Sequence, residues 1–416
     1  MKVFLQTYGC RANHYDTEAV RGMLAQAGVE EVSDPSAADF AVFNSCSVTS
    51  AAEADLRADV RRAARLNPSI RTIVMGCASG VAQRDESRSP LATLPSVESL
   101  VAGGDIAAVG SALGVSITRT RAPSVQTGAR ALLRIQDGCD EHCTFCVTTN
   151  ARGESRSRSI DDIVDEAKRL SETHPEIVVT GIHIGSYGSD IESSLGELVE
   201  KLVAKTDIVR YRLTSIEATE VDERLAELLS GNSSRVAPHL HAPLQSGSDR
   251  VLKRMGRHWY NAASYAEAVT RLIDRTDVFA LSGDVICGFP GETVEDHQAT
   301  LDLANSLPFT GLHVFPYSPR PGTAALRLSG AVPSSVTSRR ASELRALAAD
   351  KSARYTAKQI GRKADVVAVG RGSGLSEDYL SVAISDNRIA RRERFIATLM
   401  VDGDRLVAVP ESSLPE

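Results

Sequence analysis

The stretch "ALLRIQDGCDEHCTFC", residues 131–146, places three cysteines directly after a segment typical of a β-strand. Cys139, Cys143 and Cys146 follow the apolar run "ALLRIQ" at the spacing C-x3-C-x2-C. In parallel βα proteins the functional groups lie on the loops that follow the strands. The stretch therefore predicts both an α/β domain and a site at the end of its first strand.

Five more strand-like segments follow along the chain. They are "EIVVTG" (176–181), "VRYRLTS" (209–215), "APHLHA" (237–242), "ALSGDVI" (280–286) and "GLHVFPY" (311–317). Helical segments such as "IDDIVDEAKRLSE" and "LGELVEKLVAK" separate most of them. Strands that alternate with helices indicate a parallel sheet with right-handed crossovers. Residues 131–350 are therefore expected to form a full or partial parallel barrel.

The first part of the chain, residues 1–118, repeats the strand–helix alternation. Cys10, Cys46 and Cys77 each come just after a candidate strand, namely "KVFLQTY", "DFAVFNS" and "RTIVMG". The helix after the first of these strands is expected to begin at Asp16 or Thr17, which are good N-cap residues. In an open parallel sheet the carboxyl ends of the strands lie on one edge, where ligands bind. The pattern predicts a shared metal site; the alternative is three separate core cysteines, since free cysteine is often buried.

The last part, residues 351–416, contains short strand-like segments separated by Gly, Asp and Ser turns. This pattern predicts a small all-β module, such as a barrel. A polar stretch with Pro and Gly, residues 119–130, is expected to be a linker. The fold class expected is α/β, with an N-terminal open parallel sheet, a central partial βα barrel and a C-terminal β module.

Composition limits the class of protein. The chain has 416 residues, of which 42% are hydrophobic and 24% charged, so several globular domains are expected rather than disorder. The first ten residues contain no apolar stretch long enough for a signal peptide, and no run of about 18 apolar residues occurs in the sequence, so a cytoplasmic protein without a membrane span is expected. Its seven cysteines are an odd number, which argues against a disulfide framework and favours metal or catalytic use.

The formal net charge of −6 gives no global sign of nucleic-acid binding. Contact with RNA would need local basic patches. Two such patches are candidates, and the alternative for each is a solvated, salt-bridged surface. Their arginines are Arg152, Arg156 and Arg158 in the first patch, and Arg391, Arg392 and Arg394 in the second.

Three readings of the cysteines at 139, 143 and 146 can be compared. Zinc would need His142 as the fourth ligand, but adjacent residues rarely reach one tetrahedral ion together. A redox dithiol of Cys143 and Cys146 would leave Cys139 without a role. A 4Fe-4S cluster normally takes four thiolates, so three cysteines leave one iron open. That iron can chelate the amino and carboxylate groups of S-adenosylmethionine, and electron transfer into the sulfonium then cleaves a C–S bond.

The chain also resembles a known family over nearly its whole length. The motifs that carry the resemblance are "TYGCRAN", "NSCSVT", "MGC", "RIQDGCDEHCTFC", "ARGESRSRS", "LQSGSDRVLKRMGR", "GFPGET" and "FPYSPRPGTAA". In this order they are similar to the methylthiotransferase family of radical S-adenosylmethionine enzymes. The resemblance implies that the C-terminal module is of the TRAM type.

The resemblance implies two 4Fe-4S clusters, one held by Cys10, Cys46 and Cys77 and one by Cys139, Cys143 and Cys146. The first would deliver an already methylated sulfur, and a radical made at the second would remove hydrogen from the acceptor carbon, with two S-adenosylmethionine molecules used. Further contacts to S-adenosylmethionine are expected from Thr180, Gly181, Ser215, Glu217, Gly288 and Gly291; the alternative for each is ordinary turn formation.

Members of the family differ in their acceptor. Stretches around His183, His239 and His241 resemble the branch that methylthiolates C2 of N6-threonylcarbamoyladenosine next to the anticodon (position 37) of tRNA. The alternatives are N6-isopentenyladenosine in tRNA and an aspartate of a ribosomal protein. The resemblance implies tRNA and a reductant such as flavodoxin or ferredoxin as partners, and a monomer is expected.

Overall fold

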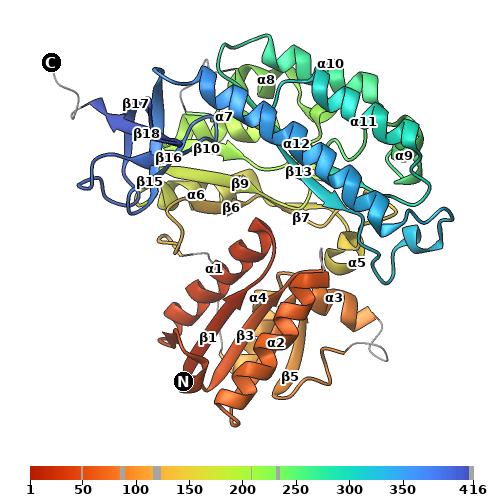
Figure 1. Ribbon diagram of the computed structural model, residues 1–416. Helices are drawn as coiled ribbons and strands as arrows, with labels where there is room; N and C mark the ends of the chain where they lie inside the picture. Colours follow the sequence, from red (N-terminus) through yellow and green to blue (C-terminus); the bar gives the residue numbers. More distant parts are fainter. Residues whose placement is uncertain (48–49, 85–89, 116–122, 208, 231–234, 412–416) are drawn as a thin grey trace.

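The computed structural model describes residues 1–47, 50–84, 90–115, 123–207, 209–230 and 235–411 (Figure 1). The predicted linker lies partly outside these residues, and its described part, 123–130, has no helix or strand. Among the described residues, no helix has the length and apolar character needed to cross a bilayer.

The N-terminal unit is a five-stranded sheet in the order β2-β1-β3-β4-β5, with every strand parallel to its neighbours. Helices α1 and α4 cover one face, and α2 and α3 cover the other, so the sheet is buried on both sides. The elements are β1 (Lys2–Thr7), α1 (Arg11–Gln26), β2 (Glu30–Val32), a 3₁₀ turn (Pro35–Ala37), β3 (Phe40–Ser45), α2 (Ser50–Leu66), β4 (Arg71–Gly76), α3 (Cys77–Arg84), β5 (Val97–Ala102) and α4 (Ile106–Leu113).

The central unit holds all six predicted strands. They form two three-stranded parallel sheets, β10-β9-β6 and β11-β12-β13, and isolated bridges between β10 and the β11 segment join the sheets into one curved wall. The predicted partial barrel is therefore confirmed. Its strands are β6 (Ala131–Arg134), β9 (Glu176–Thr180), β10 (Arg210–Leu213), β11 (His239–His241), β12 (Ala280–Cys287) and β13 (Phe309–Pro316), with a short pair β7 (Gln136–Asp137) and β8 (Arg156–Ser157).

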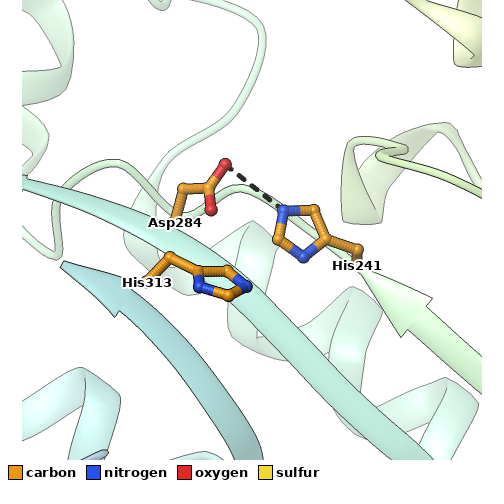
Figure 2. A group of neighbouring side chains, drawn as sticks. All are labelled: His241, Asp284 and His313. Atoms are coloured by element: carbon orange, nitrogen blue, oxygen red, sulfur yellow. Dashed lines mark ion pairs between the residues drawn. The ribbon is translucent and has the colours of Figure 1, made fainter. Parts of the chain in front are cut away.

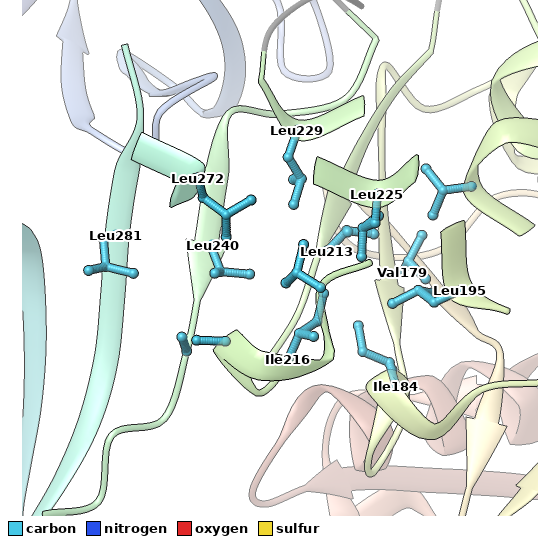
Figure 3. Packing of buried hydrophobic residues seen from close by; sticks show 14 of the residues in the cluster. Val179, Ile184, Leu195, Leu213, Ile216, Leu225, Leu229, Leu240, Leu272 and Leu281 are labelled. Atoms are coloured by element: carbon cyan, nitrogen blue, oxygen red, sulfur yellow. The ribbon is translucent and has the colours of Figure 1, made fainter. Parts of the chain in front are cut away.

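Helices cover the outside of this wall. The α-helices are α5 (Thr148–Arg152), α6 (Ile160–Ser171), α7 (Leu195–Lys205), α8 (Glu223–Leu229), α9 (Asp249–Arg254), α10 (Ala262–Ile273), α11 (Val294–Ser306) and α12 (Ser334–Lys358), with 3₁₀ turns at Ile184–Ser186, Ala218–Glu220 and Ala324–Arg327. Alternate strand residues such as Val179, Leu213, Leu240 and Leu281 pack into the main core (Figure 3). Because side chains alternate along a strand, the residues between them face the inside of the wall.

The C-terminal unit is a closed five-stranded barrel in the order β14-β15-β16-β18-β17, as the TRAM resemblance implies. Its strands are β14 (Lys363–Gly370), β15 (Ser373–Ser376), β16 (Ser381–Ile384), β17 (Arg394–Asp402) and β18 (Arg405–Pro410). The predicted boundary at 350/351 falls inside α12, which is one continuous helix. A helix is a single cooperative element, so we now place the start of the module after Lys358.

Candidate active site between two cysteine triads

Cys10, Cys46 and Cys77, here called the N-terminal triad, lie together beyond the carboxyl ends of β1, β3 and β4. A Cβ on Gly9 would lie 2.8 Å from the sulfur of Cys46, so glycine lets the Cys10 loop close over that thiol. The side-chain oxygen of Asn13 is 4.0 Å from the sulfur of Cys10 and 3.8 Å from that of Cys77. The parallel topology therefore brings three distant cysteines to one place.

Arg152 connects this triad to the central unit. Its side chain is fully buried, and its Nε donates to the sulfur of Cys77 at 3.3 Å. Its other nitrogens donate to Asn13 at 2.7 Å, Asp16 at 2.7 Å and Asp137 at 3.0 Å. One guanidinium from the central unit thus holds a cysteine, an amide and a carboxylate of the N-terminal unit.

Two thiols of this triad, those of Cys46 and Cys77, are buried and need positive charge nearby if they are to ionise, whereas Cys10 is exposed. Burial raises the pKa of Cys77 to about 11, the cation of Arg152 opposes that shift, and the neighbouring thiols of Cys10 and Cys46 add to it. Metal ligands must be deprotonated. The triad is therefore suited to hold thiolates that a bound cation and Arg152 stabilise together.

Cys139, Cys143 and Cys146, here called the loop triad, lie in the loop after β7. Gly138 has a φ of +78°, and a Cβ there would overlap the carbonyl of Glu154. The amide of Cys139 donates to the carbonyl of Gly153 at 3.0 Å, and the amide of Cys146 donates to that of Cys143 at 3.1 Å. Backbone hydrogen bonds thus fix the loop in the described structure.

Each sulfur of the loop triad has a polar partner. Arg257 donates to Cys143 at 3.4 Å, the backbone amide of Thr148 donates to Cys146 at 3.4 Å, and Nδ1 of His183 lies 3.9 Å from Cys139. Burial alone would lower the pKa of His183, but its bonds to Cys139 and Glu220 raise that pKa to about 10. These contacts complement negative charge on the sulfurs.

The donor atoms fit a cluster better than a single ion. A structural zinc ion takes four tetrahedral ligands. Each triad offers three cysteine sulfurs, and the seventh cysteine, Cys287, is buried at the end of β12. Three sulfurs without a fourth cysteine match a 4Fe-4S cluster with one open iron.

A cavity of about 230 Å³ lies beside the loop triad and reaches the N-terminal unit. Cys146 and Thr148 line it from the loop triad, and Ser47, which follows Cys46, lines it from the N-terminal unit. Its other polar lining residues are Gln245, Asp284, Ser318 and Arg320, and its apolar lining residues are Phe145, Val147, Ile286, Phe315, Pro316 and Tyr317. An apolar cavity with a few polar groups is suited to a flat organic ligand.

Close packing of two helices joins the segments that carry the two triads. A Cβ on Gly80 of α3 would overlap the carbonyl oxygen of Ala151 of α5. Cys77 begins α3, and Cys146 comes two residues before α5. Glycine at position 80 therefore allows the close backbone approach between the helix that follows Cys77 and the helix that follows Cys146.

The residues predicted to contact S-adenosylmethionine divide into two groups. Thr180 ends β9 and Gly181 follows it, just before His183, which contacts Cys139. Glu217 binds Arg257, the partner of Cys143. Burial raises the pKa of Glu217, although Arg257 opposes the shift. Ser215 lines a second cavity further along the wall.

Gly288 and Gly291 lie elsewhere. A Cβ on Gly288 would meet the side chain of Thr337, and one on Gly291 would lie 2.8 Å from the guanidinium of Arg254. Both glycines have positive φ angles, so the turn after β12 accounts for them, and neither lines the 230 Å³ cavity.

The structure assigns different environments to the arginines of the first patch. The burial of Arg152 corrects its interpretation as an RNA contact, because a fully buried guanidinium with four acceptors cannot meet a phosphate. Arg158 is half-buried and donates to Glu166 at 2.7 Å. Arg156 is exposed and donates only to backbone carbonyls, so it remains available at the surface.

The second patch contacts protein as well. Arg391 donates to the carbonyl of Thr127 at 2.6 Å, and Arg392 to that of Gln126, so both hold the segment before β6. Arg394 is paired with Asp365 of the same module at 2.5 Å. A role of these arginines in RNA binding stays a prediction.

Sequence reasoning missed several site residues. It assigned Asp16 or Thr17 to a helix start, but α1 begins at Arg11, and Asp16 is buried where Arg134 and Arg152 bind it. Arg257 lies far from the loop triad in sequence, and no motif predicted its contact with Cys143. Asn13 lies three residues after Cys10, the residue at which α1 is capped, and this spacing could have predicted that the two side chains are neighbours.

Comparison with known proteins agrees with this geometry. Residues 2–101 match the family model described as Uncharacterized protein family UPF0004, and residues 133–304 match the Radical SAM superfamily. The chain is 33% identical over 402 residues to "Threonylcarbamoyladenosine tRNA methylthiotransferase MtaB" of Thermotoga maritima, covering 93% of this chain and 92% of that one. It is also 33% identical to the protein of that name from Bacillus subtilis, covering 92% and 88%.

Solved structures show the same fold at low identity. The radical S-adenosylmethionine methyltransferase TsrM of Kitasatospora setae matches with a TM-score of 0.56 at 14% identity, over 76% of this chain and 72% of that chain. The cobalamin-dependent radical enzyme OxsB matches with a TM-score of 0.51 at 13% identity, over 83% and 56%. The two family models cover the two segments that contain the cysteine triads, and the relatives match nearly the whole chain. The chain is therefore an enzyme that uses S-adenosylmethionine and 4Fe-4S clusters, and it belongs to the radical S-adenosylmethionine methylthiotransferase family, in the branch of the threonylcarbamoyladenosine tRNA methylthiotransferases.

Proposed function

We propose that this enzyme replaces the hydrogen on C2 of N6-threonylcarbamoyladenosine in tRNA with a methylthio group. The observation that carries the proposal is one cavity of about 230 Å³ lined both by Cys146 of the loop triad and by Ser47, the residue that follows Cys46 of the N-terminal triad. Transfer of a sulfur group to an unactivated ring carbon needs a hydrogen-removing centre and a sulfur donor that reach the same atom. We infer the acceptor from the names of the relatives, which are similar to this chain over most of its length.

We assign one cluster to each triad. When bound, the cluster at Cys139, Cys143 and Cys146 supplies the electron that cleaves S-adenosylmethionine, and the cluster at Cys10, Cys46 and Cys77 carries the sulfur to be transferred. Each triad leaves one iron open, which is the position that this chemistry needs.

The residues of the chain support this chemistry by position and charge. Arg257 and Arg152 each donate to one triad, which stabilises thiolate ligands in buried surroundings. The apolar side chains of Phe145, Ile286 and Phe315 line the cavity and provide faces on which an adenine ring can pack. Thr180 and Gly181 remain our candidates for contact with S-adenosylmethionine.

The proposed acceptor also indicates where the enzyme acts and what it contacts. Because the acceptor is tRNA, we propose a cytoplasmic location. We also propose flavodoxin or ferredoxin as reductant and a monomeric chain. The exposed Arg156 beside the loop triad is our first candidate for contact with tRNA phosphate, since such contacts dominate RNA affinity.

The test is an anaerobic reaction of the reconstituted enzyme with tRNA that carries N6-threonylcarbamoyladenosine, followed by mass spectrometry of the nucleosides. One methylthio group should replace one hydrogen on that nucleoside. Product on N6-isopentenyladenosine tRNA or on ribosomal protein, with none on the proposed acceptor, would overturn the assignment.

A matched pair of variants separates the two triads. A Cys10, Cys46 and Cys77 triple alanine variant should still cleave S-adenosylmethionine to 5′-deoxyadenosine but form no methylthiolated nucleoside. The corresponding variant of Cys139, Cys143 and Cys146 should do neither. Methylthiolated product from the first variant would contradict the role given to the N-terminal unit.

A further inference from the structure

The inner face of strands β11, β12 and β13 is polar. His239 and His241 on β11, Ser282 and Asp284 on β12, and His313 on β13 occupy alternate positions, between residues that pack on the helices. The register pairs His241 with Ser282, and Asp284 with His313. A filled parallel barrel presents branched apolar side chains to its interior. This part of the wall is therefore built for binding rather than for core packing.

Three of these side chains converge on one point (Figure 2). Ligand atoms of His241, Asp284 and His313 all lie within 4.8 Å of one another. Nε2 of His241 is 3.2 Å from the carboxylate of Asp284, and the two imidazole rings are 5.7 Å apart between centroids. Side chains from three adjacent strands thus offer two imidazole nitrogens and one carboxylate.

The orientation of His241 is fixed by a residue behind it. The hydroxyl of Ser282 is 2.9 Å from Nδ1 of His241 and 3.0 Å from Nε2 of His239. A hydrogen bond at one ring nitrogen sets the tautomer and directs the other nitrogen to a ligand, as in most histidine metal sites. Nε2 of His241 is thereby presented toward Asp284.

An ion pair between His241 and Asp284 would explain only part of this arrangement. Neither ring nitrogen of His313 has a hydrogen-bond partner among the residues that the structure describes, although it lies beside both other groups. An ion pair gives no reason for a second imidazole at this point. A bound cation uses all three side chains.

The group also stands between two cavities. His241 and His313 line a cavity of about 450 Å³ that Arg11 and Tyr379 close from the N-terminal unit and the C-terminal module. Asp284 lines the 230 Å³ cavity beside Cys146. A ligand at this group would therefore lie within reach of the proposed reaction centre without using any of its cysteines.

We propose that His241, Asp284 and His313 bind one divalent transition-metal ion, with Zn²⁺ the best match. Two imidazoles and a carboxylate are a ligand set found in catalytic zinc sites, where a fourth position is left open. Fe²⁺ and Co²⁺ accept the same ligands and compete for them.

The open position takes an oxygen donor from the cavity. The acceptor of the proposed reaction carries a carboxylate and a hydroxyl on its threonyl group, and both are oxygen donors of this kind. The ion then holds the modified base by the group that distinguishes it from plain adenosine. This last step rests on the proposed function, whereas the metal site does not.

The experiment uses the anaerobically reconstituted enzyme dialysed against Zn²⁺. Elemental analysis should find one zinc per chain above the cluster iron, and zinc X-ray absorption should show nitrogen and oxygen neighbours at about 2.0–2.1 Å. His313→Ala and Asp284→Asn should each raise the dissociation constant for zinc more than about tenfold at unchanged iron content. His14→Ala, at an exposed histidine of α1, is the control and should bind zinc like the wild type. The site would be overturned if the wild-type enzyme bound no zinc, or if its zinc had sulfur neighbours at about 2.3 Å. It would also be overturned if both variants bound zinc as tightly as the wild type.

A second measurement tests the role of the ion. The wild-type enzyme should bind tRNA with the threonylcarbamoyl group more tightly than the same tRNA without it, and His313→Ala should lose this preference. An equal preference in both enzymes would overturn the role in acceptor recognition. If the wild type binds zinc but forms no methylthiolated product, the proposed function fails and the metal site stands.

Discussion

Replacement of Arg152 by Met should loosen the contact between the N-terminal unit and the central unit. The change removes a fully buried guanidinium that donates to Asp16, Asp137, Asn13 and Cys77. Breaking a buried ion pair by removing one partner costs about 3–5 kcal/mol. Arg134 still binds Asp16 at 2.5 Å, so we expect the lower end, about 3 kcal/mol.

The assay for this change is amide hydrogen exchange on the anaerobic enzyme. A loss of about 3 kcal/mol corresponds to a roughly 100-fold rise in local opening, since each 1.4 kcal/mol is tenfold. Faster exchange should appear in α5 and at the start of α1, where the two units meet, and not in the C-terminal barrel.

Arg156→Met is the matched control for this prediction. Arg156 lies four residues further along, is exposed, and donates only to backbone carbonyls, so its loss should leave exchange unchanged. If Arg152→Met exchanged like Arg156→Met and like the wild type, the buried network would not hold the two units together, and our interpretation of the interface would be wrong.

Alanine at all three positions of the loop triad should lower the iron content from about eight to about four per chain, measured by elemental analysis; full iron would show that these cysteines are not ligands. Gly80→Val should abolish methylthio transfer while cleavage of S-adenosylmethionine persists, because the side chain would separate α3 from α5 at Ala151; normal transfer would contradict the need for close approach. Burial acts to raise the pKa of Glu176, but the guanidiniums of Arg212 and Arg210 hold it well below its ordinary value. Its contribution to stability is therefore full above about pH 4.5, the pKa range of a glutamate in the unfolded chain, and is lost as the pH falls below it. In urea titrations of the cluster-free chain, Glu176→Gln should have a lower free energy of unfolding than the wild type. The difference should be constant from about pH 7 to 5 and should become smaller at lower pH. A difference that grew at lower pH would contradict a lowered pKa of Glu176.

The sequence by itself determined the order of the strands and helices and the cysteines at their ends. All six strands of the partial barrel were predictable, because apolar β-branched runs alternating with amphipathic helices encode local structure directly. The position of Cys10, Cys46 and Cys77 after three such strands predicted their meeting, because parallel topology sends all carboxyl ends of strands to one edge.

Only the tertiary structure decided which polar side chains serve the site. Arg152 and Arg156 belong to one basic run in the sequence, yet one is fully buried against Cys77 and the other is exposed. The contacts of Arg257 with Cys143, and of His241 with His313, join residues more than 70 positions apart. Such contacts depend on the register between strands and on the approach of whole helices, which no local pattern of residues encodes.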